Sequence, residues 1–276
     1  MPLSRFSARL LPLALTAATL AAACSSGGTA PQPTPTASVS SPGPSQPGVS
    51  SPSSPTPAGG GPATGPGAGA GTAWGHGPGC PAGGPAVPAR AITRPVGDVD
   101  GDGRADTGWI AAAAGSTRFG VRTATGARLS AAFALPGGAA ERSVLIADAD
   151  GAGTVVALAT DGRTVLLFRV LGCAIGPVSN AQGDQYAFDL GFRGTGTGVG
   201  CLGVGGGPVG LVGLNATPGD GQTTVRRTRI DLTGLQARNG RSDEVRVPRG
   251  GPADESAHQV TCGRLTMARD GLTVVS

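Results

Sequence analysis

The apolar residues of this chain stand in short runs separated by glycine, aspartate and asparagine, and this spacing limits the fold more than any other feature. The runs are rich in valine, leucine, isoleucine and threonine, which favour β-strands. No window of about eleven or more residues carries the apolar stripe of an amphipathic helix. We expect strands at Thr107–Ala114, Arg142–Asp148, Thr154–Thr160, Arg163–Leu171, Pro208–Leu214, Thr223–Leu232 and Leu272–Ser276. The sequence therefore predicts one all-β domain over residues 80–276.

The segment before this domain has a different composition. Residues 24–79 consist almost entirely of proline, serine, threonine, glycine and alanine. Such a segment has too few large apolar side chains to offset the entropy lost on ordering it. Proline-rich runs within it favour extended polyproline II conformations. We therefore expect residues 24–79 to form a disordered linker that holds the domain away from its point of attachment.

Residues 1–23 have the layout of an export signal. A start that contains arginine precedes an apolar stretch from Leu10 to Leu20, which is too short to span a bilayer. Residues 20–24, Leu-Ala-Ala-Ala-Cys, resemble the lipobox of bacterial lipoprotein precursors. The resemblance implies cleavage after residue 23, lipidation of Cys24 and anchoring to the extracytoplasmic face of the cell membrane. The alternative is an ordinary secretory signal followed by an incidental cysteine.

The charge pattern argues against a nucleic-acid partner. The net charge is only +4, aromatic residues make up 3% of the chain, and the arginines form no dense cluster. Binding to nucleic acid generally needs a basic surface and aromatic platforms for the bases. All 21 basic residues are arginine, and together with 50 glycines this resembles the composition of proteins from high-GC genomes such as those of actinobacteria.

The cysteines predict two disulfides. Apart from Cys24, the chain contains Cys80, Cys173, Cys201 and Cys262, an even number that favours disulfides in an oxidising compartment. Four cysteines allow three pairings, and the sequence alone does not choose among them. We favour Cys173 with Cys201, which is local, and Cys80 with Cys262, which would join the two ends of the domain. No two cysteines have the C-x-x-C spacing of a zinc site.

One loop has the spacing of a calcium site. Residues 98–106 follow the pattern D-x-D-x-D-G-x-x-D, in which carboxylates at the first, third and fifth positions converge on one cation. Carboxylates this close would repel one another without a cation. We expect one structural calcium ion, held by Asp98, Asp100, Asp102, Asp106 and the backbone carbonyl of Arg104. The loop lacks the glutamate of an EF-hand, and a strand follows it where an EF-hand has a helix.

This loop, placed before a strand, resembles the FG-GAP/VCBS repeats of integrin-like β-propellers. An echo about fifty residues later begins at Asp148 and Asp150 but has Ala152 in place of the third carboxylate, so we expect a weak second metal site there. A fainter echo at residues 191–200 retains glycines of the pattern but none of its carboxylates. The resemblance covers about residues 92–215 and implies a small or partial β-propeller-like repeat domain. A β-sandwich is the alternative, because the domain holds only about four such units.

No set of residues commits the chain to an enzyme mechanism. Patterns such as G-x-S-x-G and H-E-x-x-H do not occur. Asp243 and Glu244 are neighbours on an expected strand and would point to opposite faces, which argues against a catalytic carboxylate pair. We therefore expect a non-catalytic binding or structural module of the cell envelope, with an envelope protein or wall polysaccharide as partner. The alternative is an envelope hydrolase that acts on glycan or ester substrates.

Overall fold

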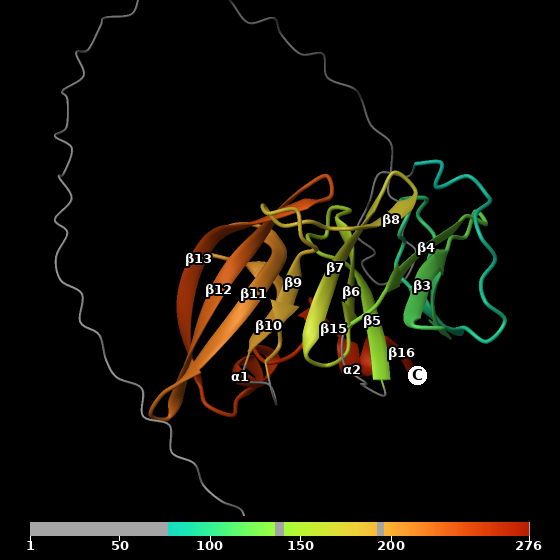
Figure 1. Ribbon diagram of the computed structural model, residues 1–276. Helices are drawn as coiled ribbons and strands as arrows, with labels where there is room; N and C mark the ends of the chain where they lie inside the picture. Colours follow the sequence, from blue (N-terminus) through green and yellow to red (C-terminus); the bar gives the residue numbers. More distant parts are fainter. Residues whose placement is uncertain (1–76, 136–140, 192–195, 276) are drawn as a thin grey trace, which may run out of the picture. The chain divides into compact units, whose positions relative to one another are not determined.

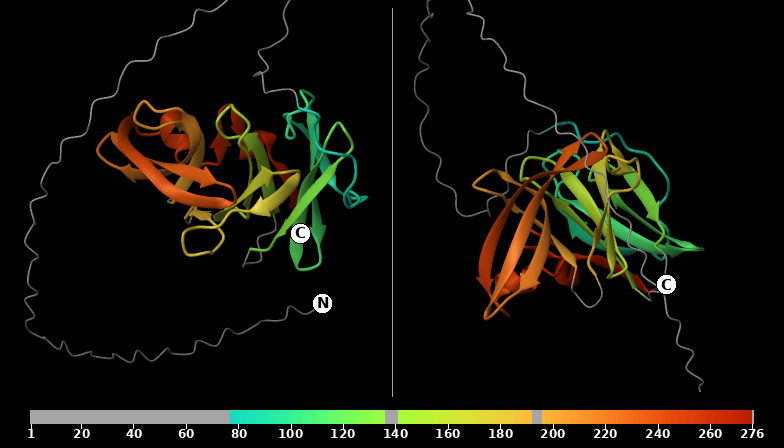
Figure 2. Two further views of the ribbon diagram at one scale, coloured as in Figure 1. Left: turned by 90° about the horizontal axis from the view of Figure 1, so that it is seen from above. Right: turned by 60° about the vertical axis from the view of Figure 1, so that its left-hand side comes forward.

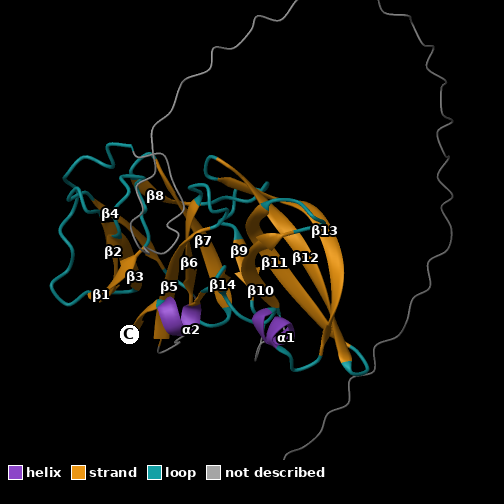
Figure 3. Cartoon of the chain, turned by 180° about the vertical axis from the view of Figure 1, so that it is seen from behind, coloured by secondary structure: helices purple, strands orange, loops and turns teal. Residues whose placement is uncertain are grey.

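The computed structural model describes residues 77–135, 141–191 and 196–275 (Figure 1). The chain divides into two compact units, Met1–Thr64 and Gly65–Ser276, and all described residues belong to the second unit. The expected signal, Cys24, nearly all of the expected linker, and Ser276 lie outside the described residues. The two helices of the described part are short, and neither is long and apolar enough to cross a membrane (Figure 3).

Three larger antiparallel sheets make up most of the described residues, which confirms the all-β fold. The first sheet contains β1 (Ile92–Val96), β2 (Asp106–Ala113), β3 (Ser116–Arg122) and β4 (Arg128–Phe133). The central sheet contains β16 (Leu272–Val275), β5 (Glu141–Asp148), β6 (Val155–Thr160), β7 (Thr164–Leu171) and β8 (Ala174–Pro177), and β9 (Ala187–Asp189) also pairs with β7. The third sheet contains β10 (Thr197–Gly203), β11 (Val209–Pro218), β12 (Gln222–Thr233) and β13 (Gln236–Pro248).

Shorter elements connect the third sheet to the last strand. They are α1 (Pro252–Ser256), β14 (Thr261–Cys262), β15 (Leu265–Thr266) and α2 (Met267–Asp270). The chain then returns to the central sheet, where β16 pairs with β5. None of the sheets among the described residues closes on itself, so the expected propeller is not confirmed.

The central sheet has both faces covered, as Figures 1 and 2 show. Every residue of β6 is buried. Ala157 lies in a core that also contains Ile110 and Phe119 of the first sheet. Its neighbour Leu158 lies in a second core, which contains Ile230 of the third sheet. Alternate residues of a strand point to opposite faces, and a strand buried on both faces is therefore apolar along its whole length.

The two aspartate loops occupy equivalent places in the first two sheets. The loop that begins at Asp98 joins β1 to β2, and the loop that begins at Asp148 joins β5 to β6. The fainter echo, residues 191–200, lies between β9 and β10 and runs into β10, and residues 192–195 lie outside the described part. The loop at Asp98 and its echo at Asp148 therefore share a structural position that the fainter echo does not.

The four cysteines of the domain form two disulfides, as expected, but our preferred pairing is wrong. Cys80 is bonded to Cys173, and Cys201 is bonded to Cys262. Cys173 lies at the tip of the β7–β8 hairpin, where it and Gly172 both have the positive φ of a tight two-residue turn. Packing of the central sheet against the first sheet brings this tip to Cys80, and packing of β10 against β14 brings the other two cysteines together.

Candidate metal centre

The loop between β1 and β2 is held in shape by its first aspartate. Asp98 accepts hydrogen bonds of 2.7 Å from the backbone N–H of Gly101 at Oδ1 and of 2.7 Å from that of Gly103 at Oδ2. Both glycines have positive φ, 77° and 81°, a conformation that is unfavourable for other residues. The glycines of the sequence pattern thus allow the backbone to curl around the Asp98 carboxylate.

Asp106 is the first residue of β2 and its side chain is buried, with only 2% of the residue exposed. Its carboxylate accepts hydrogen bonds of 2.8 Å from the backbone N–H groups of Val99 and Ala124. Burial raises the pKa of Asp106 above its ordinary value. The two N–H groups oppose this rise, and the nearby charges of Asp100 and Asp98 add to it. A bound cation would offset both the burial and the repulsion.

Asp100 is bonded through only one of its two carboxylate oxygens. Oδ2 accepts a hydrogen bond of 2.7 Å from the backbone N–H of Cys80 and lies 3.4 Å from the hydroxyl of Thr125. Oδ1 is buried and has no hydrogen-bond partner among the described residues. A buried carboxylate oxygen without a partner costs free energy, and a cation would supply the missing interaction.

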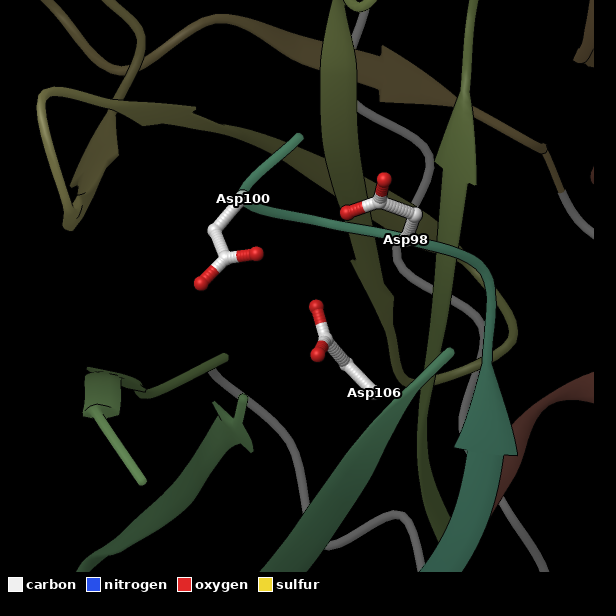
Figure 4. A group of neighbouring side chains, drawn as sticks. All are labelled: Asp98, Asp100 and Asp106. Atoms are coloured by element: carbon white, nitrogen blue, oxygen red, sulfur yellow. The ribbon is translucent and has the colours of Figure 1, made fainter. Parts of the chain in front are cut away.

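The carboxylates of Asp98, Asp100 and Asp106 face a common space, as Figure 4 shows. One oxygen from each lies within 4.8 Å of the others. Three converging carboxylate oxygens are ligands for a hard divalent cation. The cluster could therefore hold a metal ion, and three of the expected ligands are brought together.

The remaining expected ligands have other interactions. The Asp102 carboxylate forms a 2.7 Å ion pair with the Arg104 guanidinium, and it also accepts a hydrogen bond from the backbone N–H of Arg104. These contacts lower the pKa of Asp102 below its ordinary value, the side-chain hydrogen bond most strongly. The arginine two residues after Asp102 is the signal in the sequence that could have predicted this pairing. Coordination by Asp102 and by the Arg104 carbonyl stays a prediction.

The second aspartate loop is organised by its own hydrogen bonds. The Asp150 carboxylate accepts bonds from the backbone N–H groups of Ala152 and Thr154 and from the Thr154 hydroxyl. Burial opposes ionisation of Asp150, but these bonds outweigh it and lower the pKa to about 2. Burial raises the pKa of its neighbour Asp148. No third acidic, histidine or cysteine side chain in the described ranges joins this pair, so the weak second metal site stays a prediction.

The residues considered as a catalytic pair lie on opposite faces of the third sheet, as expected. Asp243 forms an ion pair and hydrogen bonds with Arg227, its partner in the β12–β13 register. Glu244 is in register with Arg226, and consecutive residues of a strand point to opposite sides. His258, which the sequence places before Cys262, lies 3.6 Å from the carboxylate of Asp254.

Comparisons of the chain with protein-family models, with curated proteins and with solved structures found no match. The resemblance to FG-GAP/VCBS repeats therefore rests on the loop residues alone. The structure adds the shared position of the two loops and the convergence of Asp98, Asp100 and Asp106. It also adds partners of the cluster that no local pattern identifies, namely the N–H groups of Cys80 and Ala124.

Proposed function

We propose that this protein is a non-catalytic binding or structural module of the cell envelope, stabilised by one calcium ion and anchored through lipid on Cys24. The observation that carries the calcium part is the cluster of Asp98, Asp100 and Asp106, in which the buried Oδ1 of Asp100 lacks a partner. The cluster ties together the β1–β2 loop, the start of β2 and the segment before β1. A cation there would hold these three segments together and stabilise the fold.

Calcium is the cation that this donor set favours. It binds six to eight oxygen ligands in a flexible geometry, whereas magnesium requires a near-ideal octahedron and keeps most of its water. Carboxylates held by backbone N–H groups of a curled loop suit the more tolerant ion. Extracellular modules bind calcium with a Kd of about 10⁻⁴–10⁻³ M. At that affinity the ion would be bound steadily outside the cell and would not serve as a sensor.

Several features favour an extracytoplasmic location for this module. The two cysteine pairs, Cys80–Cys173 and Cys201–Cys262, are at bonding distance, and disulfides persist in oxidising compartments. The lipobox-like residues 20–24 and the linker of residues 24–79 would place the domain at a distance from the membrane. An envelope protein or wall polysaccharide is the proposed partner.

We also propose that the packed sheets form a partial β-propeller-like array. The equivalent position of the loops at Asp98 and Asp148 supports an internal repeat. The face-to-face cores on both sides of β6 support it as well, because each unit of such an array needs neighbours to bury its faces.

Calcium titration of the full chain, by calorimetry and by thermal melting, tests the metal part of the proposal. We expect saturable heat at millimolar calcium and a higher melting temperature, with a smaller effect of magnesium. Absence of heat together with an unchanged melting temperature would overturn it. For the anchor, we expect Cys24→Ser to move the protein from the membrane fraction to the soluble fraction, and an unchanged distribution would contradict lipidation.

A further inference from the structure

The three arginines of β12, Arg226, Arg227 and Arg229, differ in their partners. Arg227 is paired with Asp243, and Arg229 is paired with Asp231 at 3.1 Å. The side chain of Arg226 is exposed and forms no ion pair or hydrogen bond with the residues that the structure describes. This includes Glu244, the exposed residue in register with it on β13. An unpaired guanidinium on a strand that otherwise neutralises its arginines is available for an external anion.

Arg226 lines a groove of about 460 Å³ between β9 and the third sheet. The strand register aligns Thr197, Asn215 and Arg226 in one row across β10, β11 and β12. The next row contains Gly213 and Thr228. Side chains in register on adjacent strands lie side by side on one face, so these rows form a polar wall along the groove.

The opposite side of the groove combines aromatic and acidic groups. Tyr186 and Phe188 pack edge to face with ring centroids 5.2 Å apart, and the Tyr186 hydroxyl donates a 2.5 Å hydrogen bond to Asn239. Asp189 accepts a hydrogen bond from the Gly191 N–H through Oδ1. Asp189 and Arg226 both line the groove, but they form no ion pair with each other. The groove therefore offers separate donor and acceptor groups beside an apolar surface.

Gly213 contributes to the depth of the groove. A Cβ atom at this position would lie 3.4 Å from the Thr197 methyl group and 3.6 Å from the Phe188 ring. Because Gly213 has no side chain, no atoms from this position fill the groove between Thr197 and Phe188. The volume is within the range of small-molecule sites, which are typically about 300–1,000 Å³.

We propose that this groove binds a saccharide that bears one carboxylate. Arg226 would pair with the carboxylate through its planar guanidinium, while Asn215 and Asp189 would bond to sugar hydroxyls as donor and acceptor. The partly buried Tyr186 ring would contact the apolar face of a sugar ring. A ligand with more negative charge is disfavoured because Asp189 lines the same groove. This inference rests on the proposed binding function and names its partner class, but it does not depend on the calcium site.

The test uses the full chain and two matched disaccharides. One is N-acetylglucosamine linked to N-acetylmuramic acid, whose lactyl group carries a carboxylate. The other is N,N′-diacetylchitobiose, which lacks that group. We expect calorimetry to show binding of the acidic disaccharide at least about tenfold tighter than the neutral one. We expect Arg226→Gln to remove that preference. Arg238→Gln is the matched control, because Arg238 is exposed on the same sheet but its register partner, Asp231, faces away from the groove.

Thermal melting of both variants checks that the fold is intact. Equal binding of the two disaccharides, or binding of neither, would overturn the inference, as would an equal loss in Arg238→Gln and Arg226→Gln. The same titrations with calcium and with a chelator separate this inference from the proposed function. Calcium binding without saccharide binding would overturn only the groove proposal. Saccharide binding without any calcium effect would remove only the metal part of the proposed function.

Discussion

The backbone N–H of Cys80 donates a 2.7 Å hydrogen bond to Oδ2 of Asp100. The Thr125 hydroxyl donates to the carbonyl of the same cysteine at 2.6 Å. Gly79 precedes this cysteine with a φ of 68°, and a Cβ there would lie 2.9 Å from Asp100 Oδ2. Cys80 is in turn bonded to Cys173 at the tip of the β7–β8 hairpin. The disulfide and the metal cluster are therefore joined through one residue.

This connection predicts that the Cys80–Cys173 disulfide supports calcium binding. The bond spans 93 residues, and the chain-entropy model assigns it about 4–5 kcal/mol of stability as an upper value. Replacing both cysteines by alanine should lower the free energy of unfolding and weaken calcium affinity, because the Cys80 N–H would be held less firmly against Asp100. Calorimetry and urea unfolding measure the two effects.

The second disulfide provides the matched control for that experiment. Cys201–Cys262 spans 61 residues, so its loss should destabilise the fold by a similar amount. It lies between β10 and β14, and neither cysteine contacts the metal cluster. Replacing Cys201 and Cys262 by alanine should leave calcium affinity unchanged. Equal weakening by both double variants would show that calcium affinity follows overall stability only.

Asp100→Asn should abolish the stabilisation by calcium. The amide oxygen can still accept from the Cys80 N–H, but the charge and one ligand oxygen are lost. At about 10 mM calcium, a Kd of 10⁻⁴–10⁻³ M corresponds to about 1–3 kcal/mol of stabilisation. Thermal melting with calcium and with chelator measures the difference. The control is Asp220→Asn, an exposed residue outside the cluster, which should respond to calcium like the unaltered protein.

Arg227→Gln should raise the pKa of Asp243. The side-chain hydrogen bond from Arg227 holds this pKa below its ordinary value, and the N–H of Gly205 also contributes. A lowered pKa stabilises the fold above the unfolded-state pKa of about 4, and this contribution is lost as the pH falls through the folded-state value. NMR titration of the Asp243 carboxyl measures the change. Arg226→Gln removes a neighbouring arginine that is not paired with Asp243, and a matching shift there would contradict this assignment.

Gly120→Ala should destabilise the first sheet. A Cβ on this β3 residue would lie 2.0 Å from the carbonyl oxygen of Leu129 and 2.7 Å from the indole ring of Trp109, which is 1% exposed. Neither neighbour can move freely, so we expect a loss of about 1–3 kcal/mol in urea unfolding. The control is Gly97→Ala, where a Cβ would meet nothing within 4 Å. Equal stability of the two variants would show that the sheet adjusts at Gly120.

Most of the strands that the sequence predicted contain a continuous apolar run. β6 and β7 are examples, because both contribute to the buried central sheet. A strand was expected around Asp243 and Glu244, but the full extent of β13 was not predicted. β13 is an edge strand with mostly exposed polar residues, and its pairing with β12 supplies the hydrogen bonds that local apolar residues do not indicate. β3 was missed because Gly120 and its flanking arginines interrupt the apolar pattern.

Local spacing in the sequence determined the all-β class and the curled loop at Asp98, because both depend on residues only a few positions apart. The cysteine count by itself indicated two disulfides. Tertiary structure alone decided that Cys80 pairs with Cys173 and that its N–H reaches Asp100. It also placed Arg226 and Asp189 in one groove. These relationships depend on which sheets pack together. Packing is set by long-range burial of apolar faces, and several arrangements are compatible with the same local pattern.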